Sequence, residues 1–355
     1  MRILDNLDTL RRIDRGGMLQ RAAALPEQCL DGWRKGLAWG IPSRFRSLEQ
    51  MAVLGMGGSA IGADLLQGIL SDEAIQRPMA VNRTYTIPRW IGRKTLVLVC
   101  SYSGNTEETL SGAFQAKKQG AHLLAITSGG KLASWAAEHR IPLLRIPAGL
   151  PPRSAVGTLT FAPLGLMARL GWARRKDLPV EAACRGLARE IQTHWAPSVR
   201  TAANPAKQIA QALKGRLPIL YGAAGGWEGV VYRWRTQLEE NSKTLAFHHI
   251  FPEATHNEIS GWFQPKLLMN RLAALFLTDP AVHPRTLRRM KFTAGIIRDQ
   301  GASVQRVRVS GRSRMERMLN LIALGDFVSI YLGILYKIDP TPVERVEALK
   351  KFMSR

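Results

Sequence analysis

Short apolar segments alternate with segments of helical spacing over residues 51–146, and this alternation restricts the fold more than any other feature of the chain. The runs "MAVLGMG" (51–57) and "TLVLVCS" (95–101) are each followed by a segment with the periodicity of a helix. Strands that are joined by helices lie parallel in one sheet, which the helices cover on both faces. This part of the chain is therefore predicted to form an α/β domain with a doubly wound parallel sheet.

A second series of the same kind follows the segment "PAGLPPRSAVG" (147–157), whose prolines and glycines are typical of a crossover between domains. The strand "RLPILYGA" (216–223) precedes a helix at 226–241, and "ASVQRVRVSG" (302–311) is a later strand. We therefore predict two domains of the same three-layer αβα class, at residues 1–153 and 154–355. The segments before residue 49 and at the C-terminus are expected to form peripheral helices.

The bulk properties of the chain fit a protein of the reduced cytoplasm. Its 355 residues are 46% hydrophobic, which is enough for two cores, and its three cysteines (Cys29, Cys100 and Cys184) show no CxxC spacing. The first ten residues do not resemble a signal peptide. The apolar stretch "LIALGDFVSIYLGILY" (321–336) is interrupted by Gly325 and Asp326 and is predicted to be a buried helix, so no membrane partner is expected.

The formal net charge of +23 raises the question of nucleic-acid binding. Basic residues crowd the runs at 285–291 and 306–317. However, the sequence contains no zinc-finger spacing, no RNP-like aromatic motif and no isolated basic tail. We therefore expect small anions rather than nucleic acid as partners.

A glycine-rich loop, "GMGGSAIG" (55–62), follows the first strand and opens a helix. It satisfies the weak G-x-G-x-x-G/A pattern, but no acidic residue ends the next strand to hold a ribose, and no phosphate-binding G-x-x-x-x-G-K-[ST] motif occurs. Small residues still let a ligand approach the backbone, and the N–H groups of a helix start attract an anion. Ser59 adds a hydroxyl to this loop, with helix capping as its alternative role.

A loop rich in hydroxyl groups, "SYSGNTEET" (101–109), follows the strand at 95–101. In an open parallel sheet this loop and the glycine loop meet at the same edge, where ligands bind. Neutral donors without lysine suit a phosphate monoester better than a triphosphate. Capping of the next helix by Asn105 and Glu108 is the alternative, although it leaves three hydroxyls without a role. The predicted phosphate-binding residues are Gly57, Gly58, Ser59, Ser101, Ser103 and Thr106.

Five motifs in this order, including "LPPRSAVG" (150–157), "LEENSK" (238–243) and "EATHNEISGW" (253–262), resemble the sugar isomerase (SIS) domains of bifunctional phosphoglucose/phosphomannose isomerases. The resemblance covers nearly the whole chain after about residue 45. It implies two SIS domains and the conversion of glucose 6-phosphate, and of mannose 6-phosphate, into fructose 6-phosphate. The reaction would pass through an enediol and would need neither metal nor cofactor.

The resemblance also implies roles for individual residues. The glutamate before "NSK" is Glu240, which would be the base; two acids at the C-terminal end of a helix oppose the helix dipole and already suggest a function there. Arg153 is the candidate for stabilising the enediolate, and His256 for opening the sugar ring. Lys350 would complete the site, with Lys351 as the alternative. A metal site formed by His248, His249 and His256 with Glu253 or Glu258 is the competing interpretation, but no zinc-like spacing appears.

In related isomerases the site lies between two domains and is completed by a histidine of a second subunit. A homodimer is therefore expected, in which His256 completes the neighbouring site. Two other interpretations stay open: a phosphosugar sensor without catalysis, which would have no need of Arg153, Glu240 and His256, and an isomerase of amino-sugar phosphates. The second usually carries a glutamine-hydrolysing domain, and no cysteine follows Met1 here.

Overall fold

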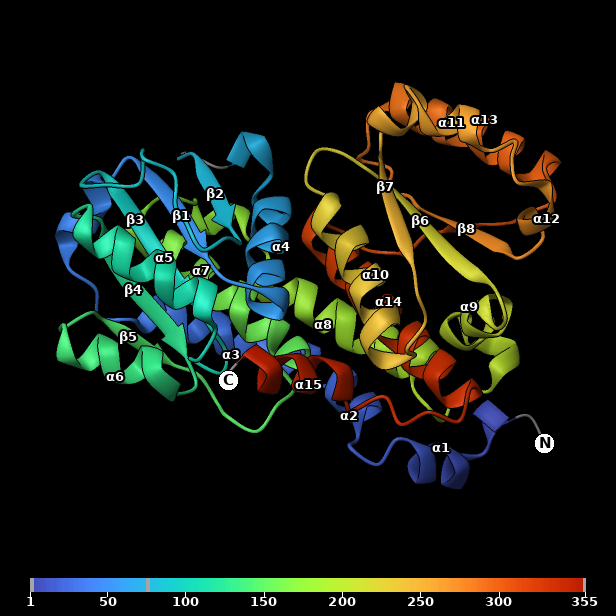
Figure 1. Cartoon of the computed structure of the whole chain (residues 1–355), viewed down its shortest axis with the longest axis horizontal. Coiled ribbons are helices and arrows are strands. Elements are labelled where there is room, and N and C mark those ends of the chain that lie inside the picture. Colours follow the sequence, from blue (N-terminus) through green and yellow to red (C-terminus); the bar gives the residue numbers. More distant parts are fainter. Residues whose placement is uncertain (1–2, 75–76, 354–355) are drawn as a thin grey trace.

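The computed structural model describes residues 3–74 and 77–353, which form two α/β halves that lie side by side, each around its own parallel sheet (Figure 1). The first sheet has the order β2-β1-β3-β4-β5 and the second the order β7-β6-β8-β9, and every described strand pair is parallel. The strands of the first sheet are β1 Gln50–Leu54, β2 Met79–Asn82, β3 Thr95–Cys100, β4 His122–Thr127 and β5 Leu143–Arg145. Those of the second are β6 Leu217–Ala223, β7 Phe247–Phe251, β8 Leu272–Leu277 and β9 Ser303–Val307. The prediction of two doubly wound parallel sheets is confirmed.

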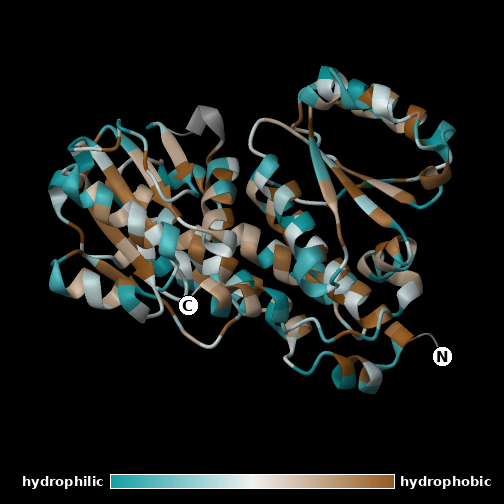
Figure 2. Ribbon diagram, viewed as in Figure 1, coloured by the Kyte–Doolittle hydropathy of each residue, from teal (hydrophilic) through white to brown (hydrophobic). Residues whose placement is uncertain are grey.

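Helices cover both faces of the first sheet, as its almost wholly apolar strands require. One face carries α5 (Glu107–Lys118) and α6 (Gly130–Glu138), and the layer between these helices and the strands consists of apolar side chains. The other face packs against α4 (Gly57–Ala74), α3 (Leu25–Ala38) and α7 (Val156–Leu170). Figure 2 shows the hydrophobic strands enclosed by helices that carry hydrophilic residues on their outer sides.

The last of the N-terminal helices is not peripheral. A short 3-10 helix (Ile3–Asp5) is followed by α1 (Leu7–Ile13) and α2 (Met18–Ala23), but α3 then packs along α7 in the core. Glycines on both helices allow this approach: a Cβ atom on Gly36 would lie 2.1 Å from the carbonyl oxygen of Ala162, and one on Gly165 would lie 2.5 Å from that of Trp33. The helical spacing was predicted correctly, whereas the close packing depends on glycines that the periodicity does not single out.

The second sheet rests on a long buried helix. Its helices are α8 (Val180–Glu190), α9 (Pro205–Leu213), α10 (Glu228–Asn241), α11 (Glu258–Gly261), α12 (Lys266–Met269), α13 (Pro284–Asp299) and α14 (Arg314–Leu335). Within the described part of the chain, α14 alone is long and apolar enough to span a membrane, but it is buried inside the protein and packs against α8, α9 and α10. The expected buried helix is therefore confirmed. The chain ends with α15 (Glu344–Met353), whose residues are all exposed.

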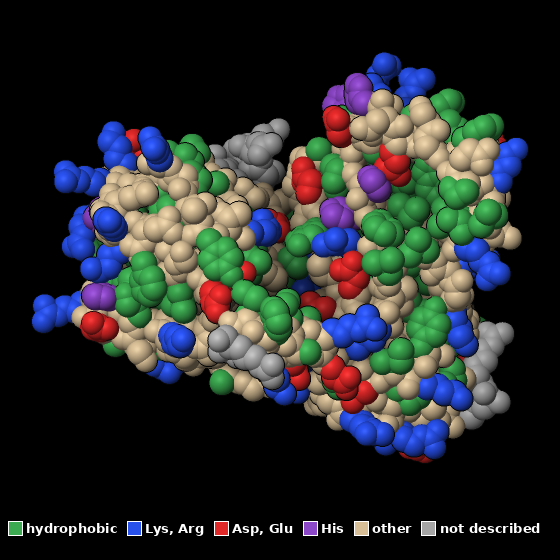
Figure 3. All heavy atoms as spheres, viewed as in Figure 1, with side chains coloured by type: hydrophobic (Ala, Val, Ile, Leu, Met, Phe, Trp, Pro, Cys, Tyr) green, Lys and Arg blue, Asp and Glu red, His purple; other side chains and the backbone are tan. Residues whose placement is uncertain are grey.

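The division into residues 1–153 and 154–355 stays a prediction. It separates the two sheets, but α7 lies after the division and packs against α3 and α4 before it. The three cysteines are free and buried. On the face drawn in Figure 3, basic side chains lie on both halves, with acidic side chains among them.

Candidate active site

The two loops with predicted phosphate-binding residues meet at the carboxyl ends of β1 and β3. The amide of Tyr102 donates to the hydroxyl oxygen of Ser59 at 3.2 Å, which links the glycine loop to the hydroxyl loop. Within the second loop, Ser101 accepts from the amide of Gly104 at 3.1 Å, and its hydroxyl is 3.0 Å from that of Thr106. Ser59 thus keeps its hydrogen for another acceptor, and because one of the Ser101 and Thr106 hydroxyls donates to the other, that pair keeps one more for an anion.

Capping does not explain these hydroxyls. The N-cap residue of α5 is Thr106, and its side chain makes no capping hydrogen bond. The side-chain oxygen of Asn105 instead accepts from the amide of Lys131 at 3.0 Å, at the start of α6. The proposed capping box of Asn105 and Glu108 is therefore wrong, because Asn105 connects two loops across the sheet edge. Ser103 accepts from the amide of Asn105 at 3.3 Å and is exposed.

The glycine loop (55–62) and the hydroxyl loop (101–109) together form what we call the cradle. Gly58 brings this cradle against the segment that carries Arg153. A Cβ atom on Gly58 would lie 2.8 Å from the carbonyl oxygen of Pro152 and 3.2 Å from the Cα atom of Arg153. Any larger residue would push the two segments apart. Arg153 belongs to a short 3-10 helix, η3 (Pro152–Ala155), which continues directly into α7. The start of α4 and the arginine are thus neighbours in space although they lie about a hundred residues apart in sequence.

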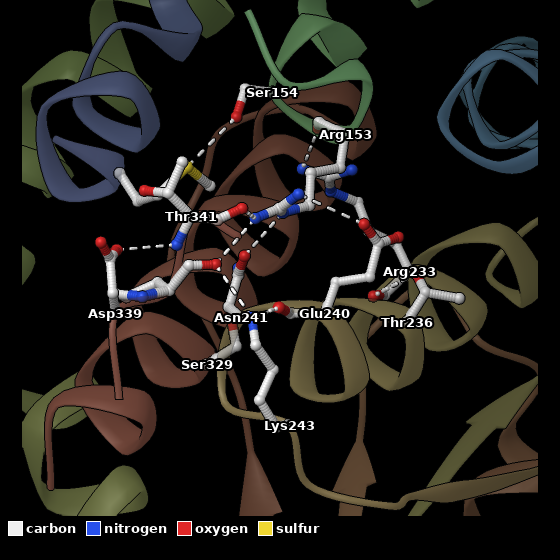
Figure 4. Close-up of polar contacts among 12 residues, drawn as sticks. Arg153, Ser154, Arg233, Thr236, Glu240, Asn241, Lys243, Ser329, Asp339 and Thr341 are labelled. Carbon is white, nitrogen blue, oxygen red and sulfur yellow. Dashed lines mark hydrogen bonds and ion pairs between the residues drawn. The ribbon is translucent and has the colours of Figure 1, made fainter. Parts of the chain in front are cut away.

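The guanidinium of Arg153 is buried and fixed from several directions (Figure 4). Its Nε donates to Oδ1 of Asn241 at 2.8 Å, and its Nη2 donates to the carbonyl oxygens of Pro340 and Thr341 at 2.8 and 2.9 Å. Its Nη1 lies 3.3 Å from Oε2 of Glu240, whose side chain is 36% exposed. Burial lowers the pKa of Arg153, and the nearby Glu240 carboxylate opposes this shift. An arginine remains charged despite such a shift, so the site holds a fixed positive charge beside an accessible carboxylate.

Behind this pair lies a buried polar network that sequence reasoning missed. Nδ2 of Asn241 donates to Ser329 at 2.9 Å, which explains why a fully buried amide is tolerated there. Arg233 donates to the carbonyl oxygen of Arg153 at 3.2 Å and to Asp326 at 2.7 Å. Asp326 interrupts the apolar run of α14, and a buried charge requires a partner. That interruption was the signal in the sequence that could have indicated this ion pair.

The two acids at the end of α10 have different partners. Glu240 faces Arg153, whereas Glu239 lies 3.9 Å from Nε of Arg235. Burial raises the pKa of Glu239. The charge of Arg235 opposes this rise, and the charge of Glu240 adds to it. Lys243 donates to the carbonyl oxygen of Glu240 at 2.5 Å and thereby caps this end of the helix. Only the second acid of the pair therefore lies beside the fixed positive charge.

Curated relatives match almost the full length of this chain. A bifunctional phosphoglucose/phosphomannose isomerase of Caldicellulosiruptor bescii is 38% identical over 94% of this chain and 98% of its own length. The protein with the same name from Aquifex aeolicus is 34% identical over 85% of this chain and 89% of its own. This chain belongs to the family of bifunctional phosphoglucose/phosphomannose isomerases. Residues 202–353 in addition match the family described as the bacterial phospho-glucose isomerase C-terminal SIS domain.

Solved structures confirm the SIS fold of this phosphoglucose/phosphomannose isomerase family member. A hypothetical protein of Thermus thermophilus superposes with a TM-score of 0.75 at 17% identity, over 98% of this chain and 93% of that one. A glucose-6-phosphate isomerase like protein of the same organism gives 0.65 at 20% identity, over 99% of both chains. At these identities the structures support the fold alone.

Two residues assigned by family resemblance lie apart from Arg153. His256 is exposed, in the turn that follows the carboxyl end of β7, whereas Glu240 lies at the end of α10, which is the opposite edge of the second sheet. Lys350 is exposed on α15. Within the described residues, the structure gives no contact of His256 or Lys350 with Arg153 or Glu240. Both assignments stay predictions.

The motif around His256 is held by Glu258, which was considered only as a metal ligand. Its carboxylate accepts from the hydroxyl of Tyr221 and from Nε1 of Trp262, and it lies 2.8 Å from Nδ1 of His249. Among the described residues, no group of three or more His, Cys, Asp or Glu side chains is placed to hold a metal ion. The structure thus assigns Glu258 an anchoring contact, and the metal-free route stays a prediction.

Proposed function

We propose that this protein interconverts glucose 6-phosphate, mannose 6-phosphate and fructose 6-phosphate. The observation that carries this proposal is the buried Arg153, which touches the cradle through Gly58 on one side and Glu240 on the other. Binding and acid–base groups are thereby brought into one site between the two sheets. The names of the family members agree with this activity.

In the proposed binding step, the loops hold the phosphate group. The residues are Gly57, Gly58, Ser59, Ser101, Ser103 and Thr106. Backbone amides at the start of α4 and free hydroxyl hydrogens donate to the phosphate oxygens. The proposed site on the first sheet lies at the carboxyl edge of its strands, where ligands bind in folds of this class.

In the proposed chemical step, the Glu240 carboxylate removes the proton from carbon 2 of the open-chain aldose. The electrons form the double bond between carbons 1 and 2, and the carbonyl oxygen becomes an enediolate oxygen that Arg153 stabilises. A proton then moves from the hydroxyl on carbon 2 to the oxygen on carbon 1, and Glu240 returns its proton to carbon 1, which gives the ketose with no atom gained or lost. Glucose and mannose 6-phosphates differ only at carbon 2, and both therefore give the same enediol.

The remaining parts of the proposal concern ring opening and assembly. We propose that His256 of a second subunit protonates the ring oxygen in a homodimer, since its exposed position at the far edge of the second sheet supports a role outside its own chain. Lys350 on α15 would approach the sugar, with Lys351 as the alternative. A cytoplasmic location agrees with three free thiols.

The decisive test distinguishes an isomerase from a phosphosugar sensor. The purified protein is incubated in chelator with glucose 6-phosphate or mannose 6-phosphate, and the appearance of fructose 6-phosphate is followed. We expect Glu240→Gln to lower kcat by about two to four powers of ten while it preserves the affinity for fructose 6-phosphate.

Glu239→Gln is the matched control, because it makes the same change one residue earlier on α10 and should retain most activity. A wild-type protein that binds fructose 6-phosphate but turns over neither aldose would favour the sensor. Loss of activity in the Glu239 variant alone would transfer the role of base to that residue.

A further inference from the structure

One helix that covers the first sheet has no counterpart on the second sheet. By strand order β4 corresponds to β9, and α5, which follows β3, corresponds to α13, which follows β8. In the first half, α6 follows β4 and packs against it. After β9 the chain instead enters α14, which packs on α10 and α9. The face of β9 next to α13 is therefore covered by α13 alone among the described helices of that layer.

A cavity of about 400 Å³ lies at this position. Its apolar floor comes from both sheet and helix, and consists of Phe276, Leu287, Met290, Ala294 and Val304. Its charged lining is entirely basic, and consists of Arg288, Lys291, Arg298, Arg306 and Arg308. The volume falls in the range of small-molecule sites.

The cations converge because of two regular patterns in the sequence. Side chains two residues apart on a strand share a face, which places Arg306 on the same face of β9 as Val304, with Arg308 just beyond. Residues three and seven apart share a face of a helix, which places Lys291 and Arg298 together on α13. A sheet face beneath a helix is normally apolar, as it is in the first half. Here the face instead carries arginines.

The charges in this cavity are not compensated within the chain. No ion pair joins Arg288, Lys291, Arg298 or Arg306 to an acidic side chain among the described residues, and no acidic residue lines the cavity. Charges that only kept an uncovered face soluble would be of mixed sign, as they are on the surface in Figure 3. Cations of one sign around a concave apolar floor concentrate anions.

We propose that this cavity binds a nucleoside di- or triphosphate. Five cations carry more positive charge than is required to bind a phosphate monoester, whose charge is about −2. The apolar floor suits a planar base, whereas Thr278, the one neutral polar residue of the lining, already accepts from Nε of Arg308 at 3.4 Å. A hexose, which needs partners for several hydroxyls, is poorly served there. The site is separate from the cradle of the first sheet and does not depend on the proposed isomerase activity.

The test measures binding of ADP and ATP by titration calorimetry at about 0.1 M salt, with adenosine and pyrophosphate as partial ligands. The wild-type protein should bind both nucleotides, and pyrophosphate and adenosine more weakly. Arg298→Gln/Arg306→Gln should weaken nucleotide binding about tenfold or more, because two charge-assisted contacts are lost. Arg288→Gln/Lys291→Gln tests the helix side in the same way.

Arg89→Gln/Arg93→Gln, at exposed positions of the first half, is the charge-matched control and should bind nucleotides as the wild type does. Isomerase kcat and KM in the cavity variants should equal those of the wild type, which separates this site from the catalytic one. The proposal is overturned if nucleotides do not bind, if fructose 6-phosphate displaces them competitively, or if the cavity variants bind them normally. Tighter binding of single-stranded RNA that the same variants weaken would assign the cavity to nucleic acid.

Discussion

The loops after the central strands β1 and β6 both contain adjacent glycines, but a carboxylate of the chain itself occupies the second loop. After β1 the small residues Gly57 to Ser59 open α4, and the loop is left for a ligand. After β6 the small residues Gly225 and Gly226 open α10, but their amides donate to the carboxylate of Glu228 at 3.1 and 2.7 Å. The second loop is thus filled by the protein's own carboxylate. The second turn is thus occupied by a carboxylate of the chain itself, whereas the first is the one that we propose to bind the phosphate group.

The two sheets also differ in the end that faces the candidate site. The first sheet contributes its carboxyl edge, with the loops after β1 and β3. The second contributes the C-terminal end of α10, which lies at the amino edge of its strands. Glu240 stands twelve residues after Glu228, which corresponds to about 18 Å of helix, so the filled loop is remote from Arg153. In the site that we propose, the two halves therefore share one fold but divide the tasks of binding and proton transfer.

The largest effect should come from changing the arginine that joins the halves. Arg153→Lys keeps the charge but cannot reach Asn241, Glu240 and the two C-terminal carbonyls with one fork of donors. We expect kcat to fall about a hundredfold to a thousandfold, and the unpaired Asn241 to cost about 1–3 kcal/mol of stability. Kinetics and thermal unfolding measure the two effects. Arg216→Lys, at an exposed position, is the control, and normal kinetics in Arg153→Lys would refute the joining role.

A medium effect should separate the free loop from the filled one. Ser101→Ala/Thr106→Ala removes two hydroxyls, so the KM for hexose 6-phosphates should rise about tenfold with a smaller change in kcat. Glu228→Gln alters the second loop instead and should lower stability by about 1 kcal/mol without a change in KM. Steady-state kinetics and denaturant unfolding would measure both variants. A raised KM in Glu228→Gln would show that the second loop also contributes to substrate binding.

The smallest effect concerns His248 on β7 of the second sheet. It lines a cavity of about 550 Å³ with Asp64, Arg83, Glu228 and Tyr232, and burial, together with Arg235 and His249, lowers its pKa from 6.5 to about 4. The unfolded chain therefore binds a proton at His248 more readily than the folded chain does. The contribution of His248 to the free energy of unfolding is thus complete above about pH 6.5 and is lost as the pH falls toward 4.

As the pH is lowered from about 6.5 to 4, the free energy of unfolding of His248→Gln should therefore fall less than that of the wild type. Thermal unfolding across that pH range measures the difference. Equal slopes for the two proteins, or an NMR titration of His248 near 6.5, would contradict the prediction.

The sequence was sufficient for the fold because the fold depends on local patterns. Apolar runs of about six residues between helical segments indicated most strands of the first sheet and β6 and β9 of the second, whereas β7, which is only partly buried, was not predicted and β8 could not be told from a helix. Asp326 did not mislead because one charge does not change the periodicity of α14. The close contact of α3 with α7 escaped prediction, since it depends on which glycines face one another. The missing counterpart of α6 also could not be read from composition or spacing.

The candidate site could be proposed from the sequence where its parts are contiguous. Ser101, Ser103 and Thr106 stand within six residues, and Glu240 adjoins a recognisable motif. The partners of Arg153 were not predicted, because Asn241 and the carbonyls of Pro340 and Thr341 meet it only through tertiary packing. A backbone carbonyl has no signature in a sequence, so this half of the arginine's surroundings requires the structure.

The carbonyl groups that fix Arg153 lie 187 and 188 residues after it. During synthesis the first sheet can fold early, while the guanidinium still lacks these acceptors. A nascent chain that has not yet released Pro340 and Thr341 from the ribosome therefore holds its phosphate cradle without a settled arginine. The full set of contacts to Arg153 therefore forms only late in translation.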